Sequence, residues 1–212
     1  MYTKKGKKDV CKVSLNIRNG KNDVMRSCIS LFIFFIGLSC WGQDAYEAIL
    51  WNPANRLSWA DFKGSPSSSG RAAAITASGI SYQFSTMESD GTFELDFTVS
   101  TYFYPNKSWY QPTICDEVIL GHEQLHFDIS ELFARKMRKL LKETKFTKNV
   151  KSEVRAIYRQ INKELAEFQN LYDDETNFSR DREKQFLWNK KIAEALKNNH
   201  IISSKSQSGS GN

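Results

Sequence analysis

Residues that interrupt or cross-link a chain are scarce in this sequence, which has only 4 prolines and 4 cysteines among 212 residues. Cys11, Cys28 and Cys40 all precede residue 43, so only Cys115 belongs to the longer remainder. That distribution excludes an internal disulfide framework. The low proline content and a hydrophobic fraction of 40% exclude a wholly disordered chain and a collagen-like fibre. About 170 residues follow position 42, enough for one domain with its own core.

An excess of charge is absent once the N-terminal segment is set aside. The chain holds 30 Lys and Arg against 24 Asp and Glu, a formal charge of +6. Residues 1–42 contain eight of the basic residues and two of the acidic ones, so residues 43–212 carry 22 of each. Basic residues in the later segments alternate with acidic ones, as on a solvated helix face. The sequence therefore predicts no nucleic-acid partner.

Long apolar runs are also absent, apart from CISLFIFFIGL at residues 28–38. This run of about 11 residues follows Arg26 and is too short to span a bilayer as a helix, whereas its length is typical of a signal-peptide core. We therefore expect residues 1–42 to be an export leader. The location that this predicts is periplasmic or secreted.

The start and the end of this leader each have two interpretations. Met25 lies directly before the basic residue and the apolar run, and a start there would give a compact leader. At the other end, small residues favour cleavage before Gln43. The alternative is a lipid anchor on Cys40, which is the weaker interpretation because Gly37 stands where a lipoprotein signal usually has a large aliphatic residue.

Two segments alternate between apolar and polar residues, the pattern of half-buried strands. Residues 75–86 place Ile80, Tyr82 and Phe84 on one face, and residues 92–104 do the same with four apolar side chains. The sequence ESDG at 88–91 is a turn signal between them. We therefore expect an antiparallel hairpin, preceded by extended structure at 44–64 and a Ser/Gly loop at 65–70.

From about residue 113 the apolar period changes to three and four residues, which predicts helices. Three helical segments follow, from 113 onward, at 150–171 and at about 179–197. Strands first and helices after indicate an α+β fold with an N-terminal antiparallel hairpin packed on about three C-terminal helices. We assign residues 43–200 to a single domain and residues 201–212, rich in Ser and Gly, to a flexible tail.

The first long helix contains GHEQLH at residues 121–126, an HExxH motif. Residues four apart project from the same face of a helix, so the imidazoles of His122 and His126 can reach one zinc ion at about 2.0–2.1 Å. Glu123 lies beside that position, where it can act as the general base on a water activated by the metal. Because the chain has only 3 histidines, this spacing favours Zn²⁺ ligands over two satisfied core histidines.

The third protein ligand that a catalytic zinc requires is left open by the sequence. Asp128 and Glu131 project from other faces of the helix, and Cys115 lies about 10 Å along it from His122. His200 stands next to the tail. The acidic cluster at 173–175 is geometrically freer, although acidic residues before a helix are commonly a solvated cap.

Several motifs together resemble a bacterial family of predicted secreted zinc-dependent proteases, long catalogued as a domain of unknown function. The shared motifs are LSWADFKG (57–64), SW (108–109), GHEQLHFD (121–128) and YDDET (172–176), with Gln185 and Trp188 beyond them. They span roughly residues 50–196 in the family's order. The resemblance implies a zincin-like fold, export, and an HExxH-type metallopeptidase with a peptide or protein substrate.

One position departs from the family pattern. Many members read YDxxTxHG in the last block, where the histidine is a natural third ligand, but this chain has Phe178 followed by Ser179. Either Asp173 or Glu175 then completes the metal site, or the metal binds weakly, or the protein no longer hydrolyses a substrate. Glu175 shares a face with Phe178 if the segment is helical. We expect peptide hydrolysis with Glu123 as the catalytic base. The alternative is a non-catalytic, envelope-side binding module that keeps the zincin-like fold.

Overall fold

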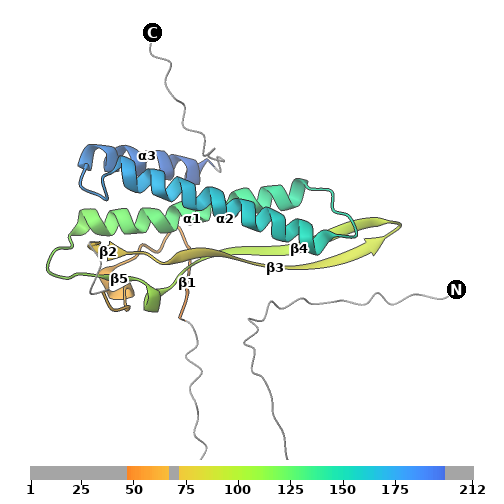
Figure 1. Cartoon of the computed structure of the whole chain (residues 1–212), viewed down its shortest axis with the longest axis horizontal. Coiled ribbons are helices and arrows are strands. Elements are labelled where there is room, and N and C mark those ends of the chain that lie inside the picture. The colour runs from red at the N-terminus through yellow and green to blue at the C-terminus, as the bar shows by residue number, and fades with distance from the viewer. Residues whose placement is uncertain (1–46, 67–71, 199–212) are drawn as a thin grey trace, which may run out of the picture.

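The computed structural model describes residues 47–66 and 72–198. The expected leader at 1–42, most of the Ser/Gly loop at 65–70 and the tail at 201–212 lie outside these ranges. Within them the chain is α+β, with antiparallel strands followed by three helices, as expected (Figure 1). The strands are β1 (Ile49–Leu50), β2 (Ala74–Ile75), β3 (Ser78–Ser89), β4 (Thr92–Phe103) and β5 (Trp109–Tyr110). The helices are α1 (Glu117–Glu143), α2 (Val150–Glu175) and α3 (Arg182–Lys197), and two 3-10 turns lie at Trp59–Asp61 and Pro105–Lys107.

The predicted hairpin is confirmed as β3 and β4, which pair from Ser78↔Phe103 to Ser89↔Thr92. Asp90 and Gly91 connect them with φ values of 51° and 76°. Two successive positive φ angles define the tight turn that matches the twist of paired strands. The strand order of the larger sheet is β1-β4-β3, which leaves β3 at an edge, while β2 and β5 form a separate pair.

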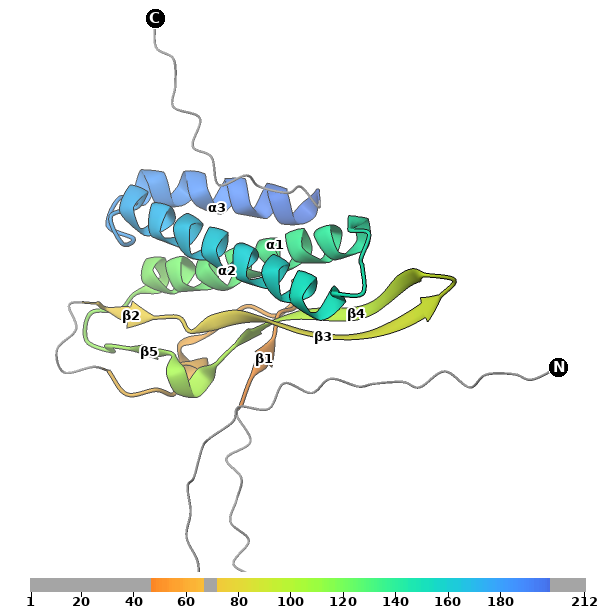
Figure 2. The same ribbon diagram turned by 45° about the vertical axis from the view of Figure 1, so that its right-hand side comes forward.

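Helix α1 begins a few residues later than the apolar period suggested. The Asp116 carboxylate accepts hydrogen bonds from the backbone amides of Val118 and Ile119, so the helix starts at Glu117. α1 lies on one face of the hairpin, and α2 and α3 pack against α1 in turn (Figure 2). In the part of the chain that the structure describes, no helix has the length and apolarity needed to cross a membrane.

Because it is covered by strands on one side and helices on the other, α1 is buried on most of its surface. The larger core cluster joins it to the hairpin, α2 and α3; its fully buried members include Ile129, Phe133, Met137, Ile161 and Ile192. A smaller cluster consists of Leu57, Phe62, Phe103 and Phe127. Polar residues of α1 are therefore buried as well, and each needs a compensating partner or a function.

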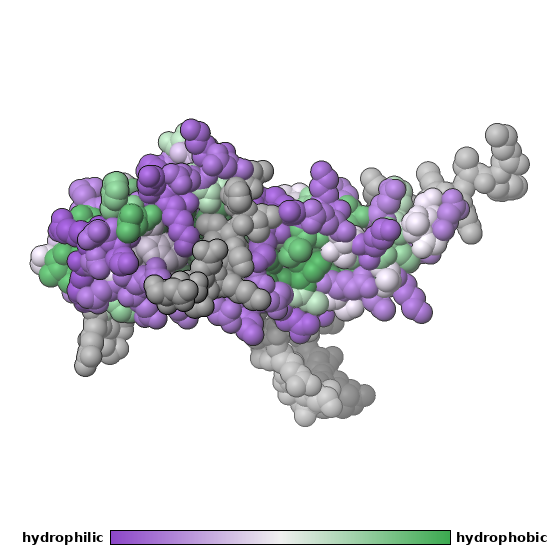
Figure 3. Space-filling model, turned by 90° about the horizontal axis from the view of Figure 1, so that it is seen from above, coloured by the Kyte–Doolittle hydropathy of each residue, from purple (hydrophilic) through white to green (hydrophobic). Residues whose placement is uncertain are grey.

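Helix α3 buries a narrow face and exposes the rest. Its buried residues are Gln185, Trp188, Ile192 and Ala195. The molecular face seen from above is mostly hydrophilic with small apolar patches (Figure 3). α3 contributes two large apolar side chains to the exposed surface, Phe186 and Leu187. The narrow face matters for the site because Gln185 stands at its N-terminal end.

Candidate metal centre

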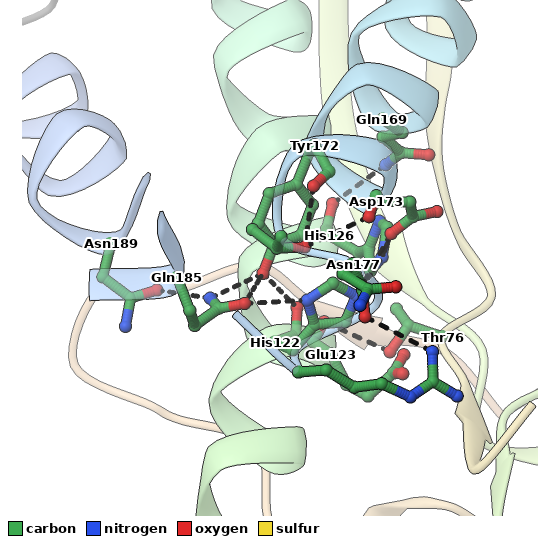
Figure 4. A network of polar contacts seen from close by, with 12 residues as sticks. Thr76, His122, Glu123, His126, Gln169, Tyr172, Asp173, Asn177, Gln185 and Asn189 are labelled. Carbon is green, nitrogen blue, oxygen red and sulfur yellow. Dashed lines mark hydrogen bonds and ion pairs between the residues drawn. The ribbon is translucent and has the colours of Figure 1, made fainter. Parts of the chain in front are cut away.

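The two histidines of the HExxH motif converge as the helical spacing requires. Their Nε2 atoms lie 3.3 Å apart, and the imidazole planes are nearly perpendicular (Figure 4). His122 is buried, while the His126 side chain keeps 13% of its surface exposed. One histidine therefore forms the back of the site and the other borders solvent.

Helix α2 supplies a third group to the same point. One carboxylate oxygen of Asp173 lies 3.1 Å from Nε2 of His122 and 2.9 Å from Nε2 of His126. The acidic cluster at 173–175 forms the last turn of α2, so the interpretation of this cluster as a cap before a helix was wrong. The helix continues to Glu175 because Phe168 and Tyr172 extend its buried stripe.

These three atoms fit a tetrahedral zinc ion. Ligands at about 2.0–2.1 Å from a tetrahedral centre stand about 3.3 Å from one another. The observed separations of 2.9, 3.1 and 3.3 Å are close to that value. Within the described residues, His122, His126 and Asp173 are the group whose geometry can hold a metal ion. Their chemistry, two imidazoles and one carboxylate, is also that of zinc sites with one open position.

The Asp173 carboxyl is held in its charged form. Burial raises its pKa, but hydrogen bonds and positive charge from His122 and His126 outweigh burial and lower the pKa to about 2. A carboxylate that is ionised at neutral pH is ready to bind a cation without first losing a proton.

His122 is oriented from behind by side chains of α2 and α3. Its Nδ1 lies 2.9 Å from Oε1 of Gln185, and its ring stacks on that of Tyr172 with 4.5 Å between centroids. Burial raises the pKa of the Tyr172 phenol well above its ordinary value. Tyr172 is therefore a neutral hydroxyl at any physiological pH.

Glu123 differs from the other buried acids of α1. Asp128 accepts hydrogen bonds from Trp51, Arg56 and Gln124, and Glu131 accepts them from Thr101, Arg135 and Arg138. The Glu123 side chain, although its residue is only 5% exposed, makes no hydrogen bond or ion pair with any residue in the described ranges. Its carboxylate is thus available for a water molecule or substrate beside the two histidines (Figure 4).

The remaining candidates for a third ligand have other positions. The carboxylate of Glu175 accepts a hydrogen bond of 2.8 Å from Nε1 of Trp188. The Cys115 thiol donates to the backbone carbonyl of Ala73. His200 lies outside the described residues. Glu175 therefore has a structural partner in Trp188. Of the acidic cluster, only Asp173 contacts His122 and His126.

The segment after α2 is not helical, so the condition under which Glu175 and Phe178 would share a helix face is not met. The helix ends at Glu175, and Asn177, Phe178 and Ser179 all have positive φ values, of 47°, 53° and 69°. Non-glycine residues adopt this conformation at a cost. The turn leaves Phe178 55% exposed rather than directed into the core.

Three residues of the site were not singled out from the sequence as site residues: Tyr172, Gln185 and Asn189. Tyr172 and Gln185 belong to the motifs of the resemblance, which was the available signal. Their contact with His122 depends on how α3 packs on α1, which a periodic pattern does not specify. Asn189 follows Gln185 by one helical turn and had no signal of its own.

The fold and site together define an α+β protein whose first two long helices assemble a candidate His-His-Asp metal centre. The chain belongs to the family described as bacterial protein of unknown function (DUF922), which it matches over residues 61–180, more than half of its length. The matched region includes His122, Glu123, His126 and Asp173. Comparison with curated proteins and with solved structures finds no match.

Proposed function

We propose that this protein is a zinc-dependent metallopeptidase with a zincin-like site. The observation that carries the proposal is the convergence of three ligating atoms within 3.3 Å of one another, next to the unpaired carboxylate of Glu123. The ligands are His122, His126 and Asp173. Two neutral imidazoles and one carboxylate would leave a bound Zn²⁺ with net positive charge, which suits work on a carbonyl group.

The residues divide the chemistry between them. When bound, zinc supplies Lewis acidity, which polarises a carbonyl group and lowers the pKa of water. Glu123 accepts a proton from the attacking water and returns it to the leaving nitrogen. The carbon–nitrogen bond breaks as a hydroxyl group joins the carbonyl carbon, so hydrolysis consumes one water and needs no other reactant. A carboxylate bound to an arginine, like that of Asp128, is a poor base for this role.

An extended peptide is the substrate class that suits the surroundings. The hydroxyl of Thr76 donates to the backbone carbonyl of Glu123, and Ser78, the first residue of β3, contacts Ser130 of α1. The start of this edge strand thus lies beside the site. Backbone groups at a sheet edge can pair with an added strand, which would align a peptide. Tyr158 already binds the carbonyl of Ile80, so the proposed pairing is confined to the beginning of β3.

The test combines metal content with hydrolysis of a denatured protein substrate. We expect one zinc per chain in the wild type and in Glu123→Gln, with hydrolysis about 10²-fold to 10⁴-fold slower in the variant. His122→Ala should lose both zinc and activity. Equal activity in the wild type and both variants would refute the proposal. Zinc bound by a wild type that hydrolyses nothing would favour the alternative, a non-catalytic envelope-side binding module.

We also propose that the apolar segment at residues 28–38 directs export, which gives the protein a periplasmic or secreted location. Its support is the sequence pattern of a basic residue followed by a short apolar run. Mass spectrometry of the protein recovered from its native bacterium distinguishes the proposed ends: an N-terminus at Gln43 indicates cleavage, and a lipid mass on Cys40 indicates an anchor. A chain that retains residues 25–42 in the cytoplasm would contradict export.

A further inference from the structure

Gln185 is a buried amide whose oxygen and nitrogen both have partners. It is 3% exposed and lies in the first turns of α3. Its Oε1 is 2.9 Å from Nδ1 of His122, and its Nε2 donates to the Tyr172 hydroxyl at 2.7 Å and to Oδ1 of Asn189 at 2.9 Å. Figure 4 shows Asn189, Gln185 and His122 joined in one line of contacts that leads to the candidate metal site.

The amide lies with Nε2 toward Tyr172 and Asn189 and with Oε1 toward His122. The hydroxyl of Tyr172 also lies 3.3 Å from the backbone carbonyl of His122 and 3.0 Å from Oε1 of Gln185. Both of those oxygens only accept, so the single hydroxyl proton is directed to one of them. The hydroxyl oxygen is then left to accept from Nε2 of Gln185. With Nε2 toward Tyr172 and Oε1 toward His122, each polar atom of Gln185 has a complementary partner.

The direction of the amide in turn decides which nitrogen of His122 is left for a metal ion. Because Oε1 only accepts, Nδ1 of His122 carries the proton in this contact, which leaves Nε2 to supply the lone pair when a metal ion binds. That lone pair is on the atom that lies 3.1 Å from Asp173. A reversed amide would present N–H groups to Nδ1, which would move the ring proton to Nε2 and block its binding to a metal.

We infer that Gln185 is a positioning residue that holds His122 in the tautomer needed for metal binding, with Tyr172 and Asn189 holding the amide. The inference rests on the proposed function and concerns the affinity of that site. His126 has no equivalent, because its Nδ1 makes no hydrogen bond with any residue in the described ranges. The arrangement therefore acts on one ligand of the pair.

Zinc affinity, measured by competition with a chromogenic chelator, tests this inference without relying on activity. Gln185→Leu fills a similar volume but cannot accept from Nδ1, and we expect it to bind zinc about 10-fold to 100-fold more weakly than the wild type. Gln185→Glu keeps an acceptor and should retain wild-type affinity or exceed it. Asn189→Ala should fall between the wild type and Gln185→Leu. Gln160→Leu, the same change at an exposed position of α2, is the matched control and should have no effect.

A second measurement reads the tautomer directly. In the zinc-loaded wild type, ¹⁵N spectra of the histidine side chains should show Nδ1 of His122 protonated and Nε2 bound to the metal. In Gln185→Leu the Nδ1 proton has no acceptor and should exchange with solvent faster, and circular dichroism of each variant checks that it is folded. Unchanged zinc affinity in folded Gln185→Leu, or zinc bound through Nδ1 of His122 in the wild type, would overturn the inference. A wild type that binds no zinc would instead overturn the proposed function.

Discussion

Nε2 of His122 and a carboxylate oxygen of Asp173 lie 3.1 Å apart although 51 positions separate the two residues in sequence. The contact exists because α1 and α2 pack against each other and α2 continues into its acidic last turn. The distance is consistent with two ligands of one metal ion and with a hydrogen-bonded pair when the ion is absent. Asp173 thus has a role in both states.

Removal of the Asp173 carboxylate should distinguish the role of this residue in zinc binding from the roles of the neighbouring acidic residues. Loss of a residue that only contacts a metal ligand weakens metal binding by up to about 100-fold. Because Asp173→Ala removes a direct ligand, we expect it to weaken zinc binding by more than about 100-fold. Asp174→Ala is the matched control, since Asp174 is exposed one position away. Titration with a zinc-responsive chelator makes the comparison. Equal weakening by both variants would indicate a general effect of charge instead of ligation.

Glu175→Gln completes the comparison of the acidic cluster. Gln at this position keeps an oxygen that can accept from Nε1 of Trp188, so we expect zinc affinity and thermal stability close to those of the wild type. Glu175→Ala should lower stability by about 1 kcal/mol, because the buried indole N–H loses its partner, and leave zinc affinity unchanged. Urea unfolding of the metal-free variants provides the stability values. A loss of zinc in Glu175→Gln would make Glu175 the third ligand instead of Asp173.

The stability of the metal-free protein should depend on Asp173 at acidic pH. The pKa of this carboxyl is lowered to about 2 in the folded protein, so its stabilising effect is present above the ordinary carboxyl range and is lost as pH falls from about 4 to 2. Because the group is partly exposed, we expect about 1 kcal/mol after solvent screening. Urea unfolding of the wild type and Asp173→Asn at pH 5 and pH 2 measures it. The difference between the two proteins should shrink at pH 2; a constant difference would contradict the ion pair.

The left-handed turn between α2 and α3 stores strain that glycine would relieve. Ser179 has a φ of 69°, a conformation that costs a residue with a Cβ about 1–2 kcal/mol. Ser179→Gly should therefore stabilise the protein by about 1 kcal/mol and raise its Tm by about 2–4 °C. Ser179→Ala removes the hydroxyl but keeps the Cβ, so it should give no such gain. If both variants raise the Tm equally, the hydroxyl and not the backbone is responsible.

Asp128 connects the segment before the hairpin to α1. It is buried and accepts hydrogen bonds from Trp51 and Gln124 as well as pairing with Arg56, whose side chain is 60% exposed. Asp128→Ala should destabilise the protein by about 2 kcal/mol because the partly buried Trp51 indole and the buried Gln124 amide lose their acceptor. Arg56→Ala should cost less than about 1 kcal/mol, since exposed ion pairs contribute little. Zinc affinity should be unchanged in both; a loss of zinc in Asp128→Ala would show that its network also supports the metal site.

The local pattern of apolar and polar residues was sufficient to predict most of the fold. Alternation at 75–86 and 92–104 with a turn at 88–91 predicted β3 and β4, and the three- and four-residue period predicted the helices. The ends were less well predicted, because they depend on single contacts such as the Asp116 cap at the start of α1. A single contact of this kind can shift a helix end by several residues without altering the apolar pattern.

The candidate site was only partly predictable for a related reason. His122, Glu123 and His126 follow from spacing within one helix. The choice between Asp173 and Glu175 depends on the packing of α2 against α1 and on where α2 ends, and two acids two positions apart have no local feature that separates them. The packing gives Asp173 to the histidines and Glu175 to Trp188. Contacts between helices, such as that of Gln185 with His122, lie beyond any periodic pattern.

We expect one zinc ion to bind between α1 and α2. The most direct measurement is an anomalous-difference map at the zinc absorption edge from crystals of the protein grown with zinc. We predict one peak at about 2.0–2.2 Å from Nε2 of His122, Nε2 of His126 and a carboxylate oxygen of Asp173. A map without a peak at this position, or with its peak at Glu175, would contradict zinc binding by His122, His126 and Asp173.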